Sequence, residues 1–280
     1  MTYLLPTSVE SAVEALADRP SMVLAGATDY YPALGGGSVQ DDIVDISSLA
    51  DLRGITHEAE HWRIGSLTTW TAIAQAELPP PFAGLQSAAT QVGGAQIQNV
   101  ASVGGNLCNA SPAADGVPPL LTLDAAVEIQ STAGTRVVPL DEFVLANRVT
   151  ALRPGELVTA VLVPEPPPTA VGSFEKLGAR AYLVISIVMV AALADIAADG
   201  TIDSARIAVG ACSPVARRLT SLEHDLVGMS VEQALEQLIT PEHLSALSPI
   251  DDVRATAEYR RTVTPTLIAR ALRACAAQRP

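Results

Sequence analysis

Apolar residues at helical spacing open the chain, and short apolar runs follow them. A helix is predicted over about residues 8–18, where Thr7 and Glu10 have the spacing of a capping box. Its buried face is expected to carry Val9, Ala12, Val13 and Leu16. The apolar runs 22–25 and 43–46 predict strands, the first of which ends in a tight turn at Gly26. The pattern predicts a small α+β unit.

The middle of the chain alternates helical and strand patterns. The expected elements are a hairpin at 55–69, helices at 68–77 and 82–92, and strands at 126–130, 136–139 and 156–163. The prolines at 79–81 separate the two helices, because proline lacks the N–H group that continues a helix. Between helix and strands, residues 93–115 are rich in Gly, Asn and Ser and predict a long loop.

A proline run at 164–168 marks the domain boundary, because it is stiff and cannot join a central strand. Beyond it the pattern predicts three strands and three helices. These are strands at 171–177, 183–194 and 202–211, and helices at 215–227, at 230–239 and from an N-cap at Thr264 with Pro265 at the first position. We therefore expect an α+β protein with domains at 1–168 and 169–280.

Composition and charge exclude several classes of partner. The 280 residues carry a net charge of −13, which repels nucleic acid and anionic membranes. Only 4% of the residues are aromatic although 49% are hydrophobic, so the core is expected to consist of Ala, Val, Leu and Ile. No signal peptide is predicted, and the longest apolar window, 183–193, is too short to cross a membrane. We expect a soluble, cytoplasmic protein.

The three cysteines suggest a reducing compartment. Cys108, Cys212 and Cys275 lie far apart and form neither a disulfide framework nor a CxxC metal site. Cys108 is expected to be a small buried hydrophobic residue. His224 and His243 are predicted on the surface of C-terminal helices.

His57 and His61 belong to a literal HExxH string, which is the pattern of zinc metalloproteases. That chemistry requires a helix, so that both imidazoles lie on one face. Here the string lies between two apolar segments that predict a hairpin, and no third ligand is evident. A solvated hairpin tip is therefore the favoured interpretation, and no metal site is expected.

Two small-residue segments are candidates for binding chemistry. The first consists of Ala25, Gly26, Ala27, Thr28 and Asp29, at the end of a predicted strand. Small residues let the backbone approach a ligand, and successive free N–H groups form an anion-binding nest. A tight turn without a ligand is the alternative.

The second segment, 101–115, concentrates glycines, hydroxyls and amides. Its candidate residues are Ser102, Val103, Gly104, Gly105, Asn106 and Asp115. Such a loop could offer N–H and O–H donors to a diphosphate, while Asp115 accepts from a hydroxyl; the alternative is a long structural loop. Neither segment is a Walker A or a GxGxxG motif, so the usual nucleotide-binding folds are not indicated.

In this order, the two segments resemble the FAD-binding medium subunit of molybdenum hydroxylases. This is the family of the carbon monoxide dehydrogenase flavoprotein and of the flavin domain of xanthine dehydrogenase. The first segment is similar to the family's Ala-Gly-Gly-x-[Ser/Thr] loop, and the second to its Thr-Ile-Gly-Gly-Asn motif. Further similar stretches lie at 154–160, 175–178 and 258–261, so the resemblance runs the length of the chain.

The resemblance implies a two-lobed FAD-binding domain of the vanillyl-alcohol-oxidase type, with lobes at about 1–55 and 56–168, and a smaller C-terminal α+β domain with a three-stranded sheet. Both segments would hold the FAD pyrophosphate, and Ser102 and Asp115 would hydrogen-bond the cofactor. Val158, Lys176 and Tyr182 match further positions near FAD, with Tyr182 at the place of an aromatic that covers the isoalloxazine ring.

The chain also departs from the family pattern. Ala27 replaces a glycine, so it is expected to keep a negative φ or to cost about 1 kcal/mol of strain. Gln98 stands where arginine is common, a two-residue deletion precedes Tyr182, and the insertion that holds an extra iron–sulfur cluster in some relatives is missing.

The implied role is electron relay within a heterotrimer that pairs into a heterohexamer. A large subunit would hold the molybdenum cofactor and a small subunit two [2Fe–2S] clusters, while FAD in this chain would pass electrons to an external acceptor. No catalytic residue for the organic substrate and no metal ligand is expected here. A free-standing FAD-dependent reductase or oxidase of the same fold, and a scaffold that has lost FAD, are the alternatives.

Overall fold

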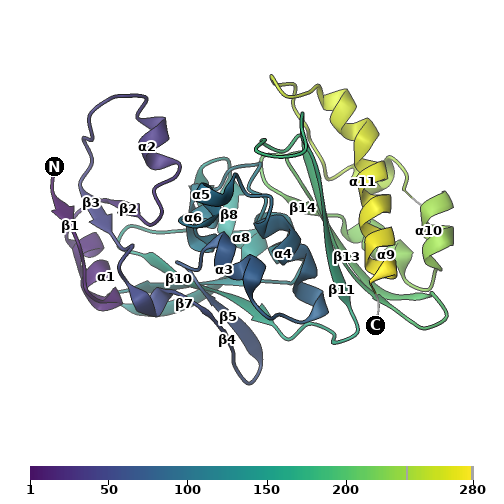
Figure 1. Ribbon diagram of the computed structural model, residues 1–280, viewed down its shortest axis with the longest axis horizontal. Helices are drawn as coiled ribbons and strands as arrows, with labels where there is room; N and C mark the ends of the chain where they lie inside the picture. Colours follow the sequence, from purple (N-terminus) through teal and green to yellow (C-terminus); the bar gives the residue numbers. More distant parts are fainter. Residues whose placement is uncertain (238, 279–280) are drawn as a thin grey trace.

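The computed structural model describes residues 1–237 and 239–278. Three sheets follow one another along the long axis of the molecule, with the N-terminal lobe at one end and the C-terminal helices at the other (Figure 1). Helices and strands are mixed throughout, which confirms the predicted α+β class.

The N-terminal lobe contains a small parallel sheet in the order β1-β3-β2. Its elements are β1 (Tyr3–Leu4), α1 (Val9–Asp18), β2 (Met22–Leu24), α2 (Tyr30–Ala33) and β3 (Ile43–Asp45). The helix and two of the strands were predicted, but the capping box lies one residue later than expected. Ser8 Oγ accepts from the N–H of Ser11, and Ser11 Oγ accepts from the N–H of Ser8, so Thr7 and Glu10 do not form it.

The middle of the chain forms a five-stranded antiparallel sheet in the order β4-β5-β10-β6-β7. Its strands are β4 (Ile55–His57), β5 (His61–Gly65), β6 (Ala126–Ser131), β7 (Gly134–Pro139) and β10 (Leu157–Pro164), and a separate ribbon consists of β8 (Val144–Ala146) and β9 (Val149–Thr150). The predicted hairpin and strands are confirmed, whereas the β8–β9 ribbon was not predicted.

The same part of the chain also contains short helices. They are η1 (Ala50–Leu52), α3 (Trp70–Gln75), η2 (Pro80–Phe82), α4 (Ala83–Ala89), α5 (Ala95–Gln98), α6 (Val103–Asn109), α7 (Val117–Thr122) and α8 (Leu140–Phe143). The long loop expected at 93–115 is wrong, because the segment contains α5 and α6. Ser102 caps α6, its Oγ accepting from the N–H of Gly105 at 3.1 Å, so the glycines begin a helix instead of extending a loop.

The C-terminal sheet has four antiparallel strands, in the order β11-β12-β13-β14, and not the expected three. They are β11 (Val171–Leu177), β12 (Val188–Ile196), β13 (Ile202–Gly210) and β14 (Arg217–Arg218). The extra strand β14 pairs with Ala208 and Val209 of β13. It lies in a segment, 215–227, that was predicted to be helical. The second strand begins at Val188 instead of 183, since residues 178–187 form a loop.

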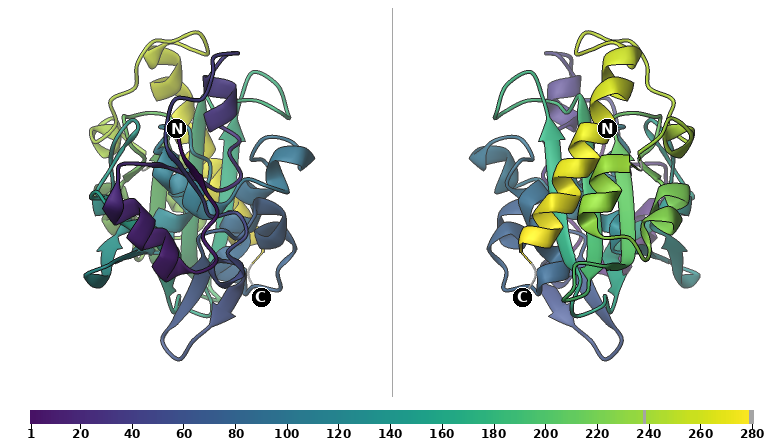
Figure 2. Two further views of the ribbon diagram at one scale, coloured as in Figure 1. Left: turned by 90° about the vertical axis from the view of Figure 1, so that its left-hand side faces the viewer. Right: turned by 90° about the vertical axis from the view of Figure 1, so that its right-hand side faces the viewer.

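Strand β12 is buried on both faces, which explains its nearly continuous apolar sequence. Val188, Val190 and Ala192 belong to the core beneath α9 (Thr220–Leu226) and α11 (Ala257–Ala277), whereas Met189 and Ala191 face the other way. Figure 2 shows α9, α10 (Val231–Gln237) and α11 over one face of the sheet. Helices α4 and α7 pack against the opposite face, so this sheet joins the two halves of the chain.

The last helix begins earlier than predicted. Thr256 is its N-cap and accepts from the N–H of Tyr259 at 3.1 Å, whereas Thr264 and Pro265 lie inside the helix. The Thr264 hydroxyl donates to the carbonyl of Arg260, and the Arg260 side chain is fully buried. Position 238, at the end of another predicted helix, lies outside the described residues.

His243 corrects another prediction. It lies in η3 (Glu242–Leu244) and is buried, with its ring bonded to Asp225 at 3.0 Å and to the N–H of Thr240 at 3.1 Å. His224 is exposed, as expected.

The buried Arg260 gives a test of this packing. Its guanidinium donates to the carbonyls of Ile187 and Ala211 and pairs with Asp252, so it connects α11, β12 and the loop at 252. Arg260→Met leaves these buried acceptors without a donor, and we expect the free energy of unfolding to fall by about 3 kcal/mol or more. Urea unfolding measures the change.

The neighbouring Arg261→Met is the matched control, because Arg261 is exposed. A change within about 0.5 kcal/mol is expected for this surface position. Equal effects of the two variants would contradict the role assigned to Arg260.

Candidate functional site

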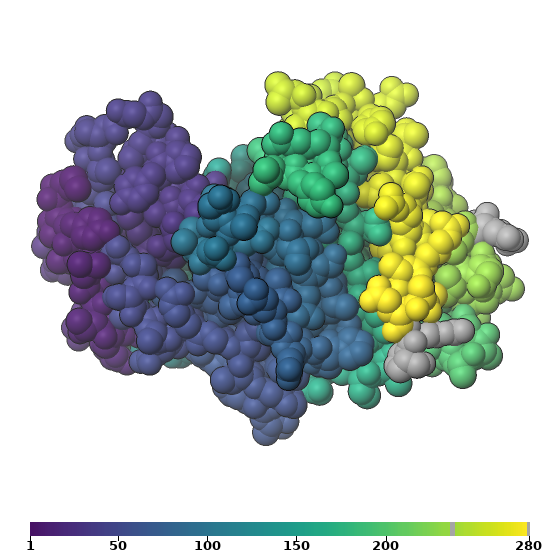
Figure 3. Space-filling view, viewed as in Figure 1, coloured from purple at the N-terminus to yellow at the C-terminus, as the bar shows by residue number. Residues whose placement is uncertain are grey.

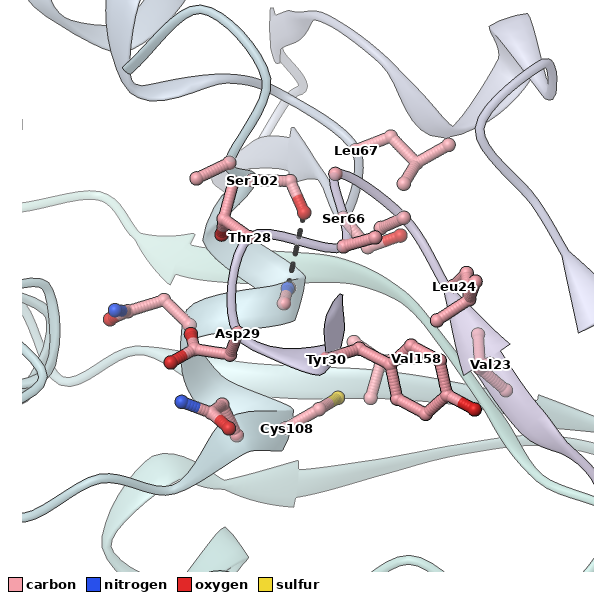
Figure 4. A pocket seen from close by; sticks show the side chains of 18 of the residues that line it. Val23, Leu24, Thr28, Asp29, Tyr30, Ser66, Leu67, Ser102, Cys108 and Val158 are labelled. Atoms are coloured by element: carbon pink, nitrogen blue, oxygen red, sulfur yellow. Dashed lines mark hydrogen bonds between the residues drawn. The ribbon is translucent and has the colours of Figure 1, made fainter. Parts of the chain in front are cut away.

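A cavity of about 550 Å³ lies where the N-terminal lobe meets the middle sheet (Figures 3 and 4). Figure 3 shows the molecular surface hollowed between the purple lobe and the blue-green helices. Its walls come from segments far apart in the sequence: residues 22–30, residues 101–109 around α6, and residues 148–158 leading into β10.

The first candidate segment forms one wall of the cavity. No hydrogen bond within the described chain occupies the N–H groups of residues 26–29. Ala27 has φ of +53°, so of the two alternatives expected at this position, a negative φ or local strain, the structure has the second. A left-handed residue inside a run of free N–H groups is the geometry of an anion-binding nest, and the local strain is of the order of 1 kcal/mol.

Gly26 allows the backbone of the N-terminal lobe to contact the backbone of the rest of the protein closely. A Cβ atom at this position would lie 2.1 Å from the carbonyl oxygen of Val100. Glycine is therefore required here for close backbone approach, and its neighbours are brought to the cavity by that contact.

In the second candidate segment, the N–H of Ser102 has no acceptor within the described chain, but those of the next four residues are occupied. The N–H groups of Val103 and Gly104 donate to the carbonyls of Thr68 and Ser66, and those of Gly105 and Asn106 donate to Ser102. A Cβ on Gly104 would lie 2.7 Å from Ser66 Cβ, so this glycine also serves a close approach. The open N–H groups beside the cavity therefore belong to residues 26–29 and to Ser102.

Ten of the predicted site residues line the cavity and four do not. The lining residues are Ala25, Gly26, Ala27, Thr28, Asp29, Ser102, Gly104, Gly105, Asn106 and Val158. Figure 4 shows Thr28 and Ser102 close together above the α6 ribbon, with the Ser102 cap as a dashed line. Val103 is buried in the core, and Tyr182 is 79% exposed on the loop between β11 and β12.

Asp115 and Lys176 lie behind the cavity wall and contact each other. The Lys176 ammonium is 2.6 Å from Asp115 Oδ2 and donates to the carbonyl of Gln91, and the Ser186 hydroxyl donates to Asp115 Oδ1 at 2.6 Å. Burial raises the pKa of Asp115, while Lys176 and Ser186 act in the opposite direction. Both carboxylate oxygens are therefore already hydrogen-bonded within the protein.

Several lining residues were not predicted from the sequence. Tyr30, Ser66, Trp70 and Arg148 line the cavity, and Arg148 is exposed without a carboxylate partner in the described chain. Arg148 lies in the turn between β8 and β9, with φ of +62°. A short apolar run at 144–146, followed by Asn147-Arg148 and then by the β-branched pair Val149-Thr150, was the signal that could have revealed this turn.

Cys108 also lines the cavity and is exposed, so the expectation of a buried residue is wrong. Although the residue faces the cavity, desolvation by the surrounding protein raises the pKa of its thiol.

The HExxH string forms the tip of the β4–β5 hairpin, as predicted. His57 pairs with Glu165 at 2.8 Å and His61 with Glu58 at 3.2 Å, so the two imidazoles have different partners. Across residues 1–237 and 239–278, no group of three or more His, Cys, Asp or Glu side chains is placed to hold a metal ion.

Comparison with known families matches both halves of the chain. Residues 1–166 match the FAD binding domain in molybdopterin dehydrogenase, and residues 173–275 match the CO dehydrogenase flavoprotein C-terminal domain. Among the described residues, no helix combines the length and apolar character that crossing a membrane requires.

Individual relatives agree with these matches. The xanthine dehydrogenase FAD-binding subunit of Escherichia coli O157:H7 is 34% identical over 98% of this chain and 96% of its own length. The nicotinate dehydrogenase FAD-subunit of Eubacterium barkeri is 35% identical over 66% of each chain. Reconstituted CO dehydrogenase from Oligotropha carboxidovorans contains a chain that superposes with a TM-score of 0.90 at 26% identity, over 99% of this chain and 98% of that one.

Gly26 provides a test of the cavity wall. In Gly26→Ala the new methyl group meets the Val100 carbonyl, and overpacking of this kind costs about 1–3 kcal/mol. We expect the wall to move and the affinity for FAD to fall by about tenfold or more. Isothermal titration of the cofactor-free chain with FAD measures the affinity.

Ala27→Gly is the matched control at the next residue. Glycine adopts a positive φ without strain, so this variant is expected to bind FAD at least as tightly as the wild type. Weakened binding by Ala27→Gly, or unchanged binding by Gly26→Ala, would contradict the geometry described above.

Glu156, which lines the cavity, is expected to make the stability of the fold depend on pH. Its carboxylate accepts two hydrogen bonds from Arg136 at 2.7 Å and one from the N–H of Arg153, and these interactions lower its pKa. A lowered folded-state pKa stabilises the fold above the usual value of about 4.3 and loses this contribution as the pH falls below it. Glu156→Gln should therefore destabilise the chain at pH 7, with the difference shrinking below about pH 4.

Urea midpoints measured between pH 7 and pH 3.5 follow this effect. The exposed Glu142→Gln serves as control and should leave the midpoint unchanged at each pH. A Glu156→Gln difference that is constant over the whole range would show that charge at this site does not contribute.

Proposed function

Because this chain belongs to the family of FAD-binding subunits of molybdenum-containing dehydrogenases, we propose that it is the electron-transfer subunit of such an enzyme. It would receive electrons from [2Fe–2S] clusters of a small subunit and pass them to an external acceptor. A large subunit would hold the molybdenum cofactor, in a heterotrimer that pairs into a heterohexamer. FAD supplies a carrier that exchanges electrons with both one-electron and two-electron partners.

The observation that supports this proposal best is the run of open N–H groups at 26–29 beside the cavity. A diphosphate needs several convergent donors, and a nest with a left-handed residue at its centre provides them. The cavity volume of about 550 Å³ is within the range of small-molecule and cofactor sites. The residues present therefore fit FAD.

The chain's own residues have separate tasks in this proposal. The N–H groups of Gly26, Ala27, Thr28 and Asp29 would hold the pyrophosphate, and Gly104 and Gly105 would let it approach the backbone. The side chains proposed to contact the rest of the cofactor are Ser102, Asn106 and Val158, which line the cavity. Asp115, Lys176 and Tyr182, which the resemblance also places near FAD, lie outside this lining, and we propose that they act on the cofactor through the loop between β11 and β12. The buried Asn106 Oδ1 lacks a partner within the described chain, which is consistent with a polar group at this wall.

Local donors must overcome an unfavourable overall charge. The net charge of −13 opposes binding of an anionic cofactor at long range. Backbone N–H groups act at hydrogen-bond distance and are insensitive to this field, and Arg148 adds one positive charge at the cavity. We expect FAD binding to depend only weakly on salt compared with binding through surface lysines and arginines.

A free-standing FAD-dependent reductase or oxidase is the alternative. Full-length similarity to a protein named as a FAD-binding subunit favours the subunit role, since the alignment covers 98% of this chain and 96% of that relative. The two functions differ in what the isolated chain can do, because a relay subunit needs its iron–sulfur partner as electron donor.

Purification of the full chain with and without its partner subunits tests the proposal. The isolated chain is expected to bind one FAD and become yellow, and to show no turnover with NADH alone. In the assembled complex, cofactor removal from this chain should abolish reduction of the external acceptor, while substrate still reduces the iron–sulfur clusters, as followed by their visible absorbance.

Two results would overturn parts of this proposal. A properly folded chain that binds no FAD would contradict cofactor binding altogether. Rapid NADH oxidation by the isolated yellow chain would favour the free-standing reductase.

A further inference from the structure

Asp115 connects the two ends of one surface loop. Its Oδ2 atom pairs with Lys176, near the end of β11, and its Oδ1 atom accepts from Ser186, two residues before β12. The loop between these strands spans residues 178–187 and is closed by the bond from the N–H of Ile187 to the carbonyl of Leu177, at 2.7 Å. One carboxylate from the other half of the chain thus holds both sides of the loop.

Two of the three side chains are nearly buried, and the third is completely buried. Exposed fractions are 6% for the Lys176 side chain, 8% for that of Asp115 and 0% for Ser186. Lys176 is moreover the only lysine in the sequence. Since Ser186 is completely buried, its hydroxyl can affect a ligand in the cavity only through Asp115 and the loop.

The loop also packs against a wall of the cavity. Lys176 donates to the carbonyl of Gln91 at 3.0 Å, and a Cβ on Gly94 would lie 2.6 Å from Leu183 Cδ2. Val92, which follows Gln91, and Ile97, three residues after Gly94, line the cavity itself. Figure 3 shows the loop, in green, on the surface beside the blue-green segment that contains α5. A shift of the loop is therefore transmitted to the wall segment 91–97.

We propose that Ser186 is a positioning residue of the FAD site: its hydroxyl orients Asp115 and, together with Lys176, keeps the loop 178–187 and the wall segment 91–97 in the binding arrangement. This inference rests on the proposed function, in which FAD occupies the cavity. By linkage, whatever keeps this cluster closed favours FAD, and FAD keeps the cluster closed to the same extent.

A matched pair of variants isolates the hydroxyl. Ser186→Thr and Ser186→Val introduce nearly the same volume at a buried position, but only threonine retains the donor to Asp115. We expect Ser186→Val to raise the dissociation constant for FAD at least fivefold relative to Ser186→Thr. Ser173→Ala removes another buried hydroxyl, which donates to the carbonyl of Ala271 at 2.9 Å, and should lower thermal stability without changing FAD affinity.

The single lysine provides a second measurement that a general loss of stability would not reproduce. Acetic anhydride acylates exposed amines, so peptide mass spectrometry of the FAD-loaded full chain reports opening at Lys176, with the N-terminal amine as internal reference. Lys176 should be acylated at least tenfold faster in Ser186→Val than in Ser186→Thr, and at the wild-type rate in Ser173→Ala.

The outcomes separate the two proposals. Equal FAD affinity and equal Lys176 acylation in the threonine and valine variants, with normal binding by the wild type, would overturn the role of Ser186 alone. A wild-type chain that binds no FAD would overturn the proposed function and this inference with it. Loss of affinity in Ser173→Ala equal to that in Ser186→Val would show that the effect is unspecific.

Discussion

The cavity depends on one steric constraint, the contact of the Gly26 backbone with the carbonyl of Val100. A side chain at this glycine would have to occupy the space of that oxygen, so the N-terminal lobe could not reach the body of the protein. A second contact of the same kind, Gly104 on Ser66, supports the segment from below. Because both contacts are between backbone atoms or small side chains, they leave little freedom for relative movement, and the N–H groups of residues 26–29 acquire a fixed direction.

The two halves of the chain are joined by apolar burial and by a small number of buried charges. Strand β12 is covered on both faces, by α11 on one side and by α4 and α7 on the other, which makes the C-terminal sheet part of both cores. Asp115 and Lys176 add an ion pair across the same boundary, and both carboxylate oxygens of Asp115 accept a hydrogen bond. Such a pair contributes more to a unique arrangement than to net stability, because desolvation offsets most of the attraction.

The electrostatics of the cavity are local. A chain with net charge −13 opposes the approach of an anionic cofactor at long range, and Arg148 places one positive charge at the cavity. Open backbone N–H groups can hold a diphosphate without that long-range field, and their strength depends on geometry rather than on salt. This explains how an acidic protein of a flavin-binding family can retain its cofactor.

The sequence by itself determined those structural elements that depend on residues close together in the chain. The hairpin at the HExxH string, the doubly buried strand β12 and the small-residue loop after β2 follow from local patterns, and the resemblance carried by two short motifs indicated the family correctly. What only the tertiary structure decided is which groups remain available. The N–H groups of Val103 and Gly104 are occupied by Thr68 and Ser66, more than thirty positions away, and Asp115 by Lys176 and Ser186. Likewise, Ala27 has a positive φ and Pro265 lies within a helix, although the local preference of each residue disfavours these conformations. A hydrogen-bond donor is free or occupied only with respect to the whole fold, so no local pattern could reveal it.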